Sequence, residues 1–241
     1  MLDWLLRKPH EAPSLQLGQR DVPVAIRRLP HARRMTLRLA PDGSEVRLSV
    51  PRWVRTADAM AFVHARQDWL EVQLAQVRQP TPPMPGGELP FRGELLRIEH
   101  QPDARRRPDL AAGLLRIGGP ADALAPRLRR WLQAQARALL EADLAEYCAR
   151  AGKPVPRMAL SNARRRWGSC AADGTIRINW RLVMAPDAVR RSVVAHEVAH
   201  LVHFDHTPAF HACLGALFEG DITAANRWLK HEGRGLYACF D

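Results

Sequence analysis

The chain has 241 residues, enough for one large domain or two modest ones, and its 46% hydrophobic content can supply a substantial core. No segment approaches the roughly 18 uninterrupted apolar residues that a membrane span needs, so we expect no membrane partner. The start, MLDWLLRKPHEAPS, has Asp3 within a very short apolar run and lacks a small-residue cleavage site, unlike a secretory signal. The expected location is therefore the cytoplasm.

The net charge of +11 and the pI near 10.8 are values that binding to nucleic acid would favour. However, only Lys8, Lys153 and Lys230 of the 36 basic residues are lysines. The chain is also rich in Ala, Leu and Pro, a bias that GC-rich coding produces by itself. Charge alone leaves nucleic acid as an alternative partner but not the favoured one, and the sequence gives no indication of oligomeric state.

The first part of the chain is predicted to be rich in β-strands. Residues 1–20 contain several helix and strand breakers, and we expect them to form a flexible tail. From Val22 polar and apolar residues alternate, and Asp42-Gly43 predicts a turn between two strands. Thr56 is expected to be the N-cap of a single helix over residues 57–79. The segment PTPPMPGG ends this helix and is the best linker candidate.

The second part is predicted to combine strands and helices. Short strands are expected in LPFRGELLRIEH and GLLRIGG, on either side of the charged loop QPDARRRPDL. A long helix should follow Pro126 and end at Gly152. Two further strands, residues 157–166 and 175–184, are expected to flank the turn AADG. No internal repeat is visible. We therefore predict an α+β chain, with a small β-rich region and one helix over residues 21–120 and a second domain over 121–241.

The stretch VVAHEVAHLVHFDHTPAFH, Val193 to His211, carries five of the ten histidines. On a helical wheel His196 and His200 share one face, while the valines and Leu201 lie on the opposite side. Two imidazoles one turn apart can bind a single zinc ion. Glu197 lies beside them, close enough to take a proton from a bound water without ligating, which is the chemistry of the H-E-x-x-H motif. Pro186 and Asp187 are expected to begin this helix.

A third ligand is needed to complete such a site. His203 has a suitable angle but lies about 10 Å further along the axis than His196. Thr207 and Pro208 have the sequence of a helix start, so the chain is expected to turn after Phe204 and bring His206 back to the ion. Glu219 is the competing ligand, because some zinc peptidases take a glutamate from a later helix.

The segments RRRWGSC, GTIRINWRLVMAP and VVAHEVAHLVHFDHTPAF, in this order and spacing, resemble the YgjP-like metallopeptidases, a branch of the zincin clan related to the SprT-like proteases. The resemblance implies a zincin-like metallopeptidase domain over residues 121–241 that hydrolyses peptide bonds in a peptide or protein substrate. It also implies that His196, His200 and His206 bind Zn2+ and that Glu197 is the catalytic acid and base. In zincins an extended substrate pairs with a sheet edge beside the metal helix, a role that would fall to TIRINWRLV.

Several alternatives remain open. A basic, nucleic-acid-associated SprT-like protein, acting on DNA-bound proteins or carrying a structural zinc, is the second hypothesis. Tyr237, His203, His231 and the arginines near the second pair of strands are candidate oxyanion donors. Residues 167–170 are expected to fix a turn, and Cys170 has no recognisable histidine partner that would make it a nucleophile. The absence of HxE and PCxxC patterns argues against a base deaminase.

Overall fold

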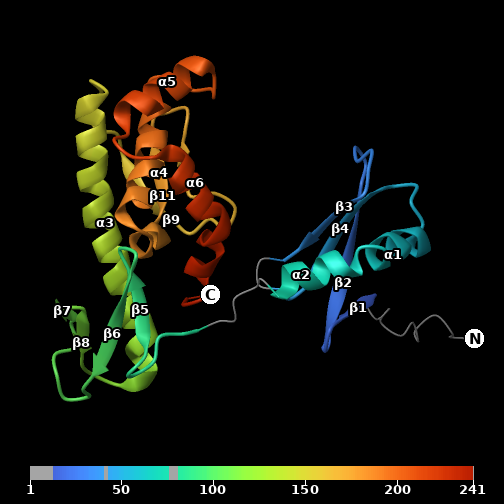
Figure 1. Ribbon diagram of the computed structural model, residues 1–241, viewed down its shortest axis with the longest axis horizontal. Coiled ribbons are helices and arrows are strands. Elements are labelled where there is room, and N and C mark those ends of the chain that lie inside the picture. Colours follow the sequence, from blue (N-terminus) through green and yellow to red (C-terminus); the bar gives the residue numbers. More distant parts are fainter. Residues whose placement is uncertain (1–12, 41–42, 76–80, 241) are drawn as a thin grey trace, which may run out of the picture. The chain divides into compact units, whose positions relative to one another are not determined.

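The computed structural model describes residues 13–40, 43–75 and 81–240 (Figure 1). The chain is mixed α+β, with three sheets and six α-helices in this described part. It divides into two compact units between Gln79 and Pro80. The boundary expected between residues 120 and 121 is therefore wrong. Strands over residues 88–117 belong to the second unit because Leu89, Ile98 and Leu115 are buried in the same core as the long helix that follows.

The N-terminal unit contains a four-stranded sheet of β1 (Ser14–Leu17), β2 (Arg20–Leu29), β3 (Thr36–Leu39) and β4 (Val46–Pro51). The strand order is β1-β2-β4-β3, with β2 and β4 parallel and the outer pairs antiparallel. Leu15 and Leu17 of β1 are buried in the core, so the expected tail is wrong from Ser14 onward. Residues 1–12 and Asp42 of the expected turn lie outside the described residues, but β3 and β4 do form the expected antiparallel pair.

The single helix expected over residues 57–79 is in fact two, α1 (Thr56–His64) and α2 (Gln67–Ala75), with residues 76–79 outside the described part. The break carries neither proline nor glycine. Arg66 folds back there, with its guanidinium 3.7 Å from the Phe62 ring centre and a hydrogen bond of 3.3 Å to the Phe62 carbonyl. That carbonyl lies in the last turn of α1, so the side chain of Arg66 caps the helix. Thr56 is the first helical residue, and its hydroxyl accepts from Arg28 instead of capping.

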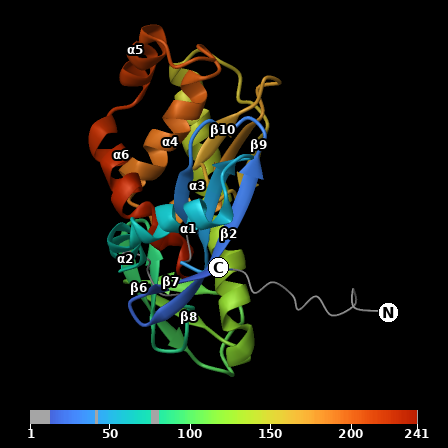
Figure 2. The ribbon, with the colours of Figure 1, turned by 90° about the vertical axis from the view of Figure 1, so that its right-hand side faces the viewer.

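The second unit begins with β5 (Glu88–Phe91), β6 (Glu94–His100), β7 (Asp109–Ala111) and β8 (Leu114–Ile117). Their order, β5-β6-β8-β7, and their pairing directions repeat those of the first sheet, although the sequence shows no repeat. A short 3-10 turn leads into α3 (Leu124–Arg150), which begins before Pro126, earlier than expected. Figures 1 and 2 show this sheet at the N-terminal end of α3 and α5 near its other end, with α4 and α6 between them.

The third sheet consists of β9 (Met158–Ser161), β10 (Gly168–Cys170) and β11 (Ile176–Asn179), in the order β10-β11-β9. The AADG turn is present and joins β10 to β11. The strand expected over residues 157–166 is wrong beyond Ser161: β9 ends there and pairs with β11 in parallel, and the separate strand β10 precedes the turn. The strand expected to reach Met184 ends at Asn179, whose side chain accepts from the Arg181 amide at 3.0 Å and starts a 3-10 turn over Trp180–Met184. Because β11 is the central strand, it cannot be the edge that pairs with substrate.

The remaining helices are α4 (Asp187–Ala199), α5 (Pro208–Leu217) and α6 (Ile222–His231), followed by a 3-10 turn over Gly233–Tyr237. α4 packs against α3, α5, α6 and β10, which places it at the centre of the unit. Among the residues that the structure describes, no helix is long and apolar enough to cross a membrane.

Candidate metal centre

α4 carries the H-E-x-x-H motif and is fixed at its N-terminal end by a buried ion pair. Arg190 donates from Nε to Asp143 of α3 at 2.7 Å, and their side chains are 3% and 6% exposed. Arg191 adds bonds to Glu146 at 2.8 and 2.9 Å. Arg190 also pairs with Asp187, so loss of the Asp143 carboxylate would leave its charge only partly compensated, at a cost near the lower end of the roughly 3–5 kcal/mol for breaking a buried pair. The pair therefore holds α4 in one orientation on α3.

The β5–β6 turn holds the segment that leads into α4. The amides of Arg92 and Gly93 donate to the carbonyls of Val183 and Met184 at 2.8 and 3.1 Å. Gly93 has φ +86°, and a Cβ there would lie 3.0 Å from Cα of Pro186, so this close approach requires glycine. The guanidinium of Arg92 also pairs with Asp187, the first residue of α4.

Three histidine side chains converge at the C-terminal end of α4. His196 lies in the helix, His200 is the residue that ends it, and His206 comes from the loop before α5. Nε2 of His196 lies 3.2 Å from Nε2 of His200 and 3.2 Å from Nε2 of His206. One nitrogen from each ring lies within 4.8 Å of the others. The structure thus brings together the three histidines predicted as ligands, and their ligation of a metal stays a prediction.

A tight turn places His206 in this group. After Ala199 the helix tightens, with Leu201 and Val202 each donating to a carbonyl three residues back at 2.9 and 3.0 Å. Pro208 then lies in the first turn of α5, at the position expected for it. Thr207 precedes α5 as predicted, although its side chain makes no capping hydrogen bond.

The three imidazoles all contact one aromatic ring. Phe210 of α5 is fully buried, with its ring centre 5.0, 4.5 and 4.7 Å from those of His196, His200 and His206.

The tautomer of His200 follows from its hydrogen bond. Nδ1 of His200 lies 3.2 Å from the His203 carbonyl, which can only accept a hydrogen bond. Nδ1 therefore carries the proton and Nε2 presents its lone pair to the cluster.

The environment keeps His196 and His200 neutral. Burial, together with the neighbouring His200 and His206, lowers the pKa of His196 to about 4. Burial is also the main cause of the lowered pKa of His200. Neutral imidazoles with free lone pairs are the form that binds a cation. His206 is exposed, so the cluster is open to solvent on one side.

Glu197 is 5% exposed, and its carboxylate accepts no hydrogen bond from any residue that the structure describes. Burial raises its pKa to about 7, although the charge of Arg166 opposes the shift. β10 passes directly over the carboxylate: a Cβ on Gly168 would lie 2.3 Å from Oε1 of Glu197. Gly168 therefore belongs to the site, a role that differs from the turn expected for residues 167–170. A glycine within a strand often marks such a close approach, so Gly168 itself was the feature of the sequence that could have indicated this role.

A cavity of about 230 Å³ opens beside these groups. Gly168, His196 and Glu197 contribute to its wall. The rest of the wall is mainly apolar and comes from α4, α5, α6 and the residue before β10, namely Trp167, Ser192, Val193, Leu214, Ile222, Asn226 and Leu229. The arrangement thus combines a possible cation site, a buried carboxyl group and a space for an apolar group.

Glu219, the competing metal ligand, and Tyr237, a candidate oxyanion donor, form hydrogen bonds to other groups. The Glu219 carboxylate accepts from the Tyr147 hydroxyl at 2.9 Å and from Arg150 and Arg191 at 2.8 and 2.7 Å, and it is not part of the histidine cluster. The Tyr237 hydroxyl donates to the Ala163 carbonyl at 2.8 Å.

Two further residues are also unsuited to the roles considered for them. His231 is exposed at the end of α6, and it does not line the cavity beside Glu197. Burial and the nearby Glu197 raise the pKa of Cys170, which disfavours a reactive thiolate.

The chain also matches the profile of one known protein family. The profile of a family described as YgjP-like, metallopeptidase domain, matches residues 33–232. Neither the curated proteins nor the solved structures gave a match. The family implies a metal ion and a peptide or protein substrate. The match spans most of the chain and confirms the resemblance seen in the sequence: this protein belongs to the YgjP-like metallopeptidase family.

Proposed function

We propose that this protein is a zinc-dependent peptidase of zincin-like architecture, in which His196, His200 and His206 hold the ion. The convergence of the three imidazoles carries the proposal. Two ligands at 2.0–2.1 Å from a tetrahedral zinc ion are about 3.3 Å apart, and the two Nε2–Nε2 distances here are 3.2 Å. Three neutral nitrogen ligands are typical of catalytic zinc sites, which keep a fourth position open.

Bound zinc supplies Lewis-acid chemistry, polarising a carbonyl oxygen and allowing water to ionise near neutral pH. Glu197 is suited to move the proton in this reaction. Its pKa of about 7 lets the carboxylate accept a proton from the attacking water and return it to the leaving amine at neutral pH. The backbone of Gly168 confines the carboxylate on one side.

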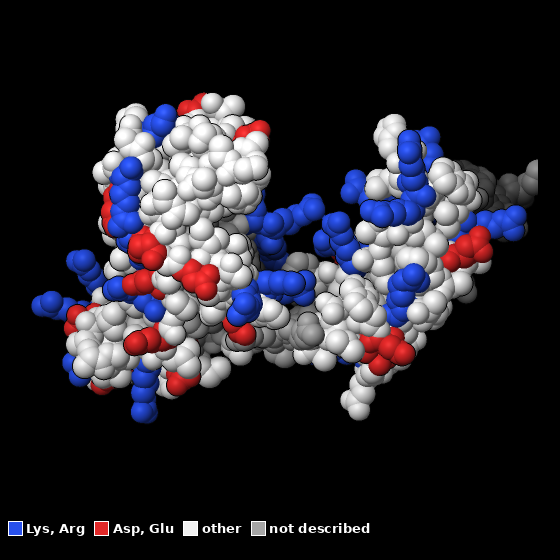
Figure 3. Space-filling view, turned by 45° about the horizontal axis from the view of Figure 1, so that its top comes forward, with Lys and Arg blue, Asp and Glu red and all other residues white. Residues whose placement is uncertain are grey.

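The surroundings favour a peptide as substrate. β10 is an edge strand beside α4, so its free side can pair with an extended peptide backbone in place of the central β11. The adjoining cavity can take an apolar side chain. α5 contains no charged residue, and the surface over it is largely white in Figure 3. A nucleic-acid backbone would require cations at this face.

Substitution of Glu197 by glutamine tests the catalytic assignment. We expect Glu197→Gln to retain one zinc per chain and to reduce turnover of a quenched fluorescent peptide by at least 100-fold, because the isosteric amide cannot accept the proton. Glu219→Gln is the matched control, since Glu219 is bonded to α3 and α4 away from the cluster. Wild-type turnover by a zinc-loaded Glu197→Gln variant would refute the assignment.

A further inference from the structure

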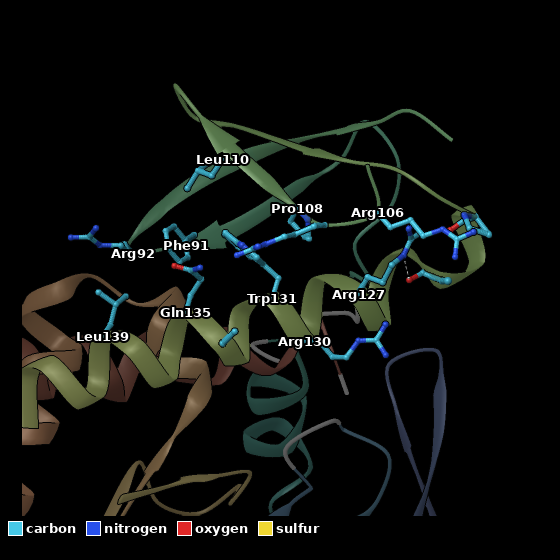
Figure 4. A pocket seen from close by; sticks show the side chains of 14 residues that line it. Phe91, Arg92, Arg106, Pro108, Leu110, Arg127, Arg130, Trp131, Gln135 and Leu139 are labelled. Carbon is cyan, nitrogen blue, oxygen red and sulfur yellow. Dashed lines mark hydrogen bonds between the residues drawn. The ribbon is translucent and has the colours of Figure 1, made fainter. Parts of the chain in front are cut away.

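A second and larger cavity, of about 940 Å³, lies between the first half of α3 and the sheet β5–β8. Its lining includes five arginines, Arg92, Arg106, Arg107, Arg127 and Arg130, and no acidic residue. In Figure 4, Arg92 lies at one end of the row of labelled side chains and Arg106 and Arg127 at the other. Phe91, Trp131 and Pro108 lie between these ends. A cationic group therefore flanks an aromatic and apolar middle on each side.

The arginine-rich loop before β7 is held against the end of β8. The amides of Gly118 and Gly119 donate to the carbonyls of Arg105 and Pro102 at 2.7 and 2.8 Å. A Cβ on Gly118 would lie 1.9 Å from the Ala104 carbonyl oxygen, so only glycine allows the loop to approach this closely. These contacts fix the loop immediately before Arg106 and Arg107, and thereby position both side chains at the cavity.

The arginines that line this cavity outnumber the carboxylates that pair with them in the described part of the chain. Arg92 is paired with Asp187. Arg127 is only 9% exposed, and its guanidinium donates to the carbonyls of Gly118, Pro120 and Ala123 but to no carboxylate of the described residues. Arg106 and Arg107 are exposed and have no ion-pair partner in the described part of the chain. A buried cation stabilised only by carbonyl dipoles favours an anion in the adjoining cavity.

The aromatic middle indicates what kind of anion fits. Trp131 is half-buried, and its ring centre lies 5.0 Å from that of Phe91, which fixes the indole. Nucleobases stack on such rings regardless of their identity, and guanidinium groups bind phosphates bidentately. An acidic peptide offers the carboxylates but has no regular supply of stacking groups. The chain's net charge of +11 also favours a polyanion over a short peptide.

We propose that this cavity binds single-stranded nucleic acid, with phosphates on Arg106 and Arg107 and a base stacked on Trp131. The volume is at the upper end of the range for ligand sites and accommodates about two or three nucleotides. Net charge alone did not favour this partner. The anchored arginine loop beside a fixed indole is the additional observation that does.

The salt dependence of binding tests the phosphate contacts. A fluorescein-labelled 12-nucleotide strand is titrated with the full chain by fluorescence anisotropy between 50 and 200 mM salt. In the double variant Arg106→Gln/Arg107→Gln, we expect at least tenfold weaker binding at low salt. The slope of log K against log salt should be shallower by about 1.4, or about 0.7 for each lost phosphate contact. The control Arg33→Gln/Arg34→Gln removes the same charge from the N-terminal unit and should change neither value.

The stacking contact is tested separately. Trp131→Leu keeps an apolar side chain against Phe91 and should weaken binding about tenfold with an unchanged salt slope, because no charge is removed. Equal losses in both arginine double variants would overturn the proposal in favour of general charge attraction. Equal binding of a labelled oligo-glutamate, with the same sensitivity to Arg106→Gln/Arg107→Gln, would assign the cavity to acidic peptides instead. Because the double variant changes only exposed loop residues, its result does not depend on how Trp131→Leu folds.

Discussion

Gly168→Ala is the most informative small change at the proposed active site. The new Cβ would lie 2.3 Å from Oε1 of Glu197 and 2.7 Å from both Cγ and Cδ, whereas ordinary contact begins near 3.4 Å. The carboxylate must therefore move by about 1 Å. A displacement of this size at a catalytic group costs about 100-fold in rate, equivalent to about 2.7 kcal/mol in activation free energy. We expect kcat to fall by that factor, with the zinc content unchanged because no histidine is touched.

The fold should tolerate the change, because the carboxylate can move into the 230 Å³ cavity that it shares with Gly168. We expect a loss of stability below about 2 kcal/mol by chemical denaturation. Gly215→Ala is the matched control: its Cβ would meet no atom within 4 Å, and alanine favours the α5 helix by about 1 kcal/mol. Both variants are assayed on a quenched fluorescent peptide that the wild type cleaves. A zinc-loaded Gly168→Ala variant with kcat within twofold of wild type would refute the proposed position of the catalytic carboxylate.

Three further predictions concern the supports of the site. Phe210→Leu should weaken zinc affinity by about 10- to 100-fold in a chelator competition, whereas Phe218→Leu, also buried in α5's surroundings, should leave it unchanged. Asp143→Asn should lower the unfolding free energy by about 3 kcal/mol, at the lower end of the cost of breaking a buried ion pair, because Arg190 loses one of its two carboxylate partners and keeps Asp187. Glu141→Gln at an exposed pair should cost under about 0.5 kcal/mol. Burial raises the pKa of the Glu219 carboxyl group. Hydrogen bonds from the Glu219 amide, Tyr147 and Arg191 outweigh this effect and lower the pKa to about 2. The stabilisation from the ionised Glu219 is complete above the unfolded pKa of 4.5 and is lost as pH falls toward 2. After allowance for the 45% exposure of its side chain, Glu219→Gln should remove about 1 kcal/mol of this acid-dependent stability.

Local patterns in the sequence were sufficient to predict the histidine cluster. His196 and His200 follow from helical spacing, and His206 follows from the helix start at Thr207 and Pro208. Each of these signals acts over a few residues, which is why no knowledge of the fold was needed. The contact of Phe210 with all three imidazoles could not be predicted, because it depends on how α5 docks.

Features that depend on tertiary contacts were not predictable in the same way. The alternation of apolar and polar residues continues through Trp180–Met184, but these residues form a 3-10 turn in which even Arg181 is buried. The parallel pairing of β9 with β11 joins segments separated by β10, and no turn signal encodes it. α1 ends without glycine or proline because Arg66 folds back onto Phe62. The first strand lies within a segment whose breakers suggested a tail, and its two leucines are buried only once the sheet has formed.

The central claim is that three histidines bind one zinc ion, and metal stoichiometry after dialysis against a weak chelator tests it most directly. We predict one zinc per chain for the wild type and less than about a tenth for His206→Ala, because two remaining nitrogens hold zinc far less tightly than three. His211→Ala should retain a full equivalent, because His211 is exposed and is not one of the three histidines that converge, although its ring centre lies 6.4 Å from that of His206. Full retention by His206→Ala, or no zinc in the wild type, would contradict the account.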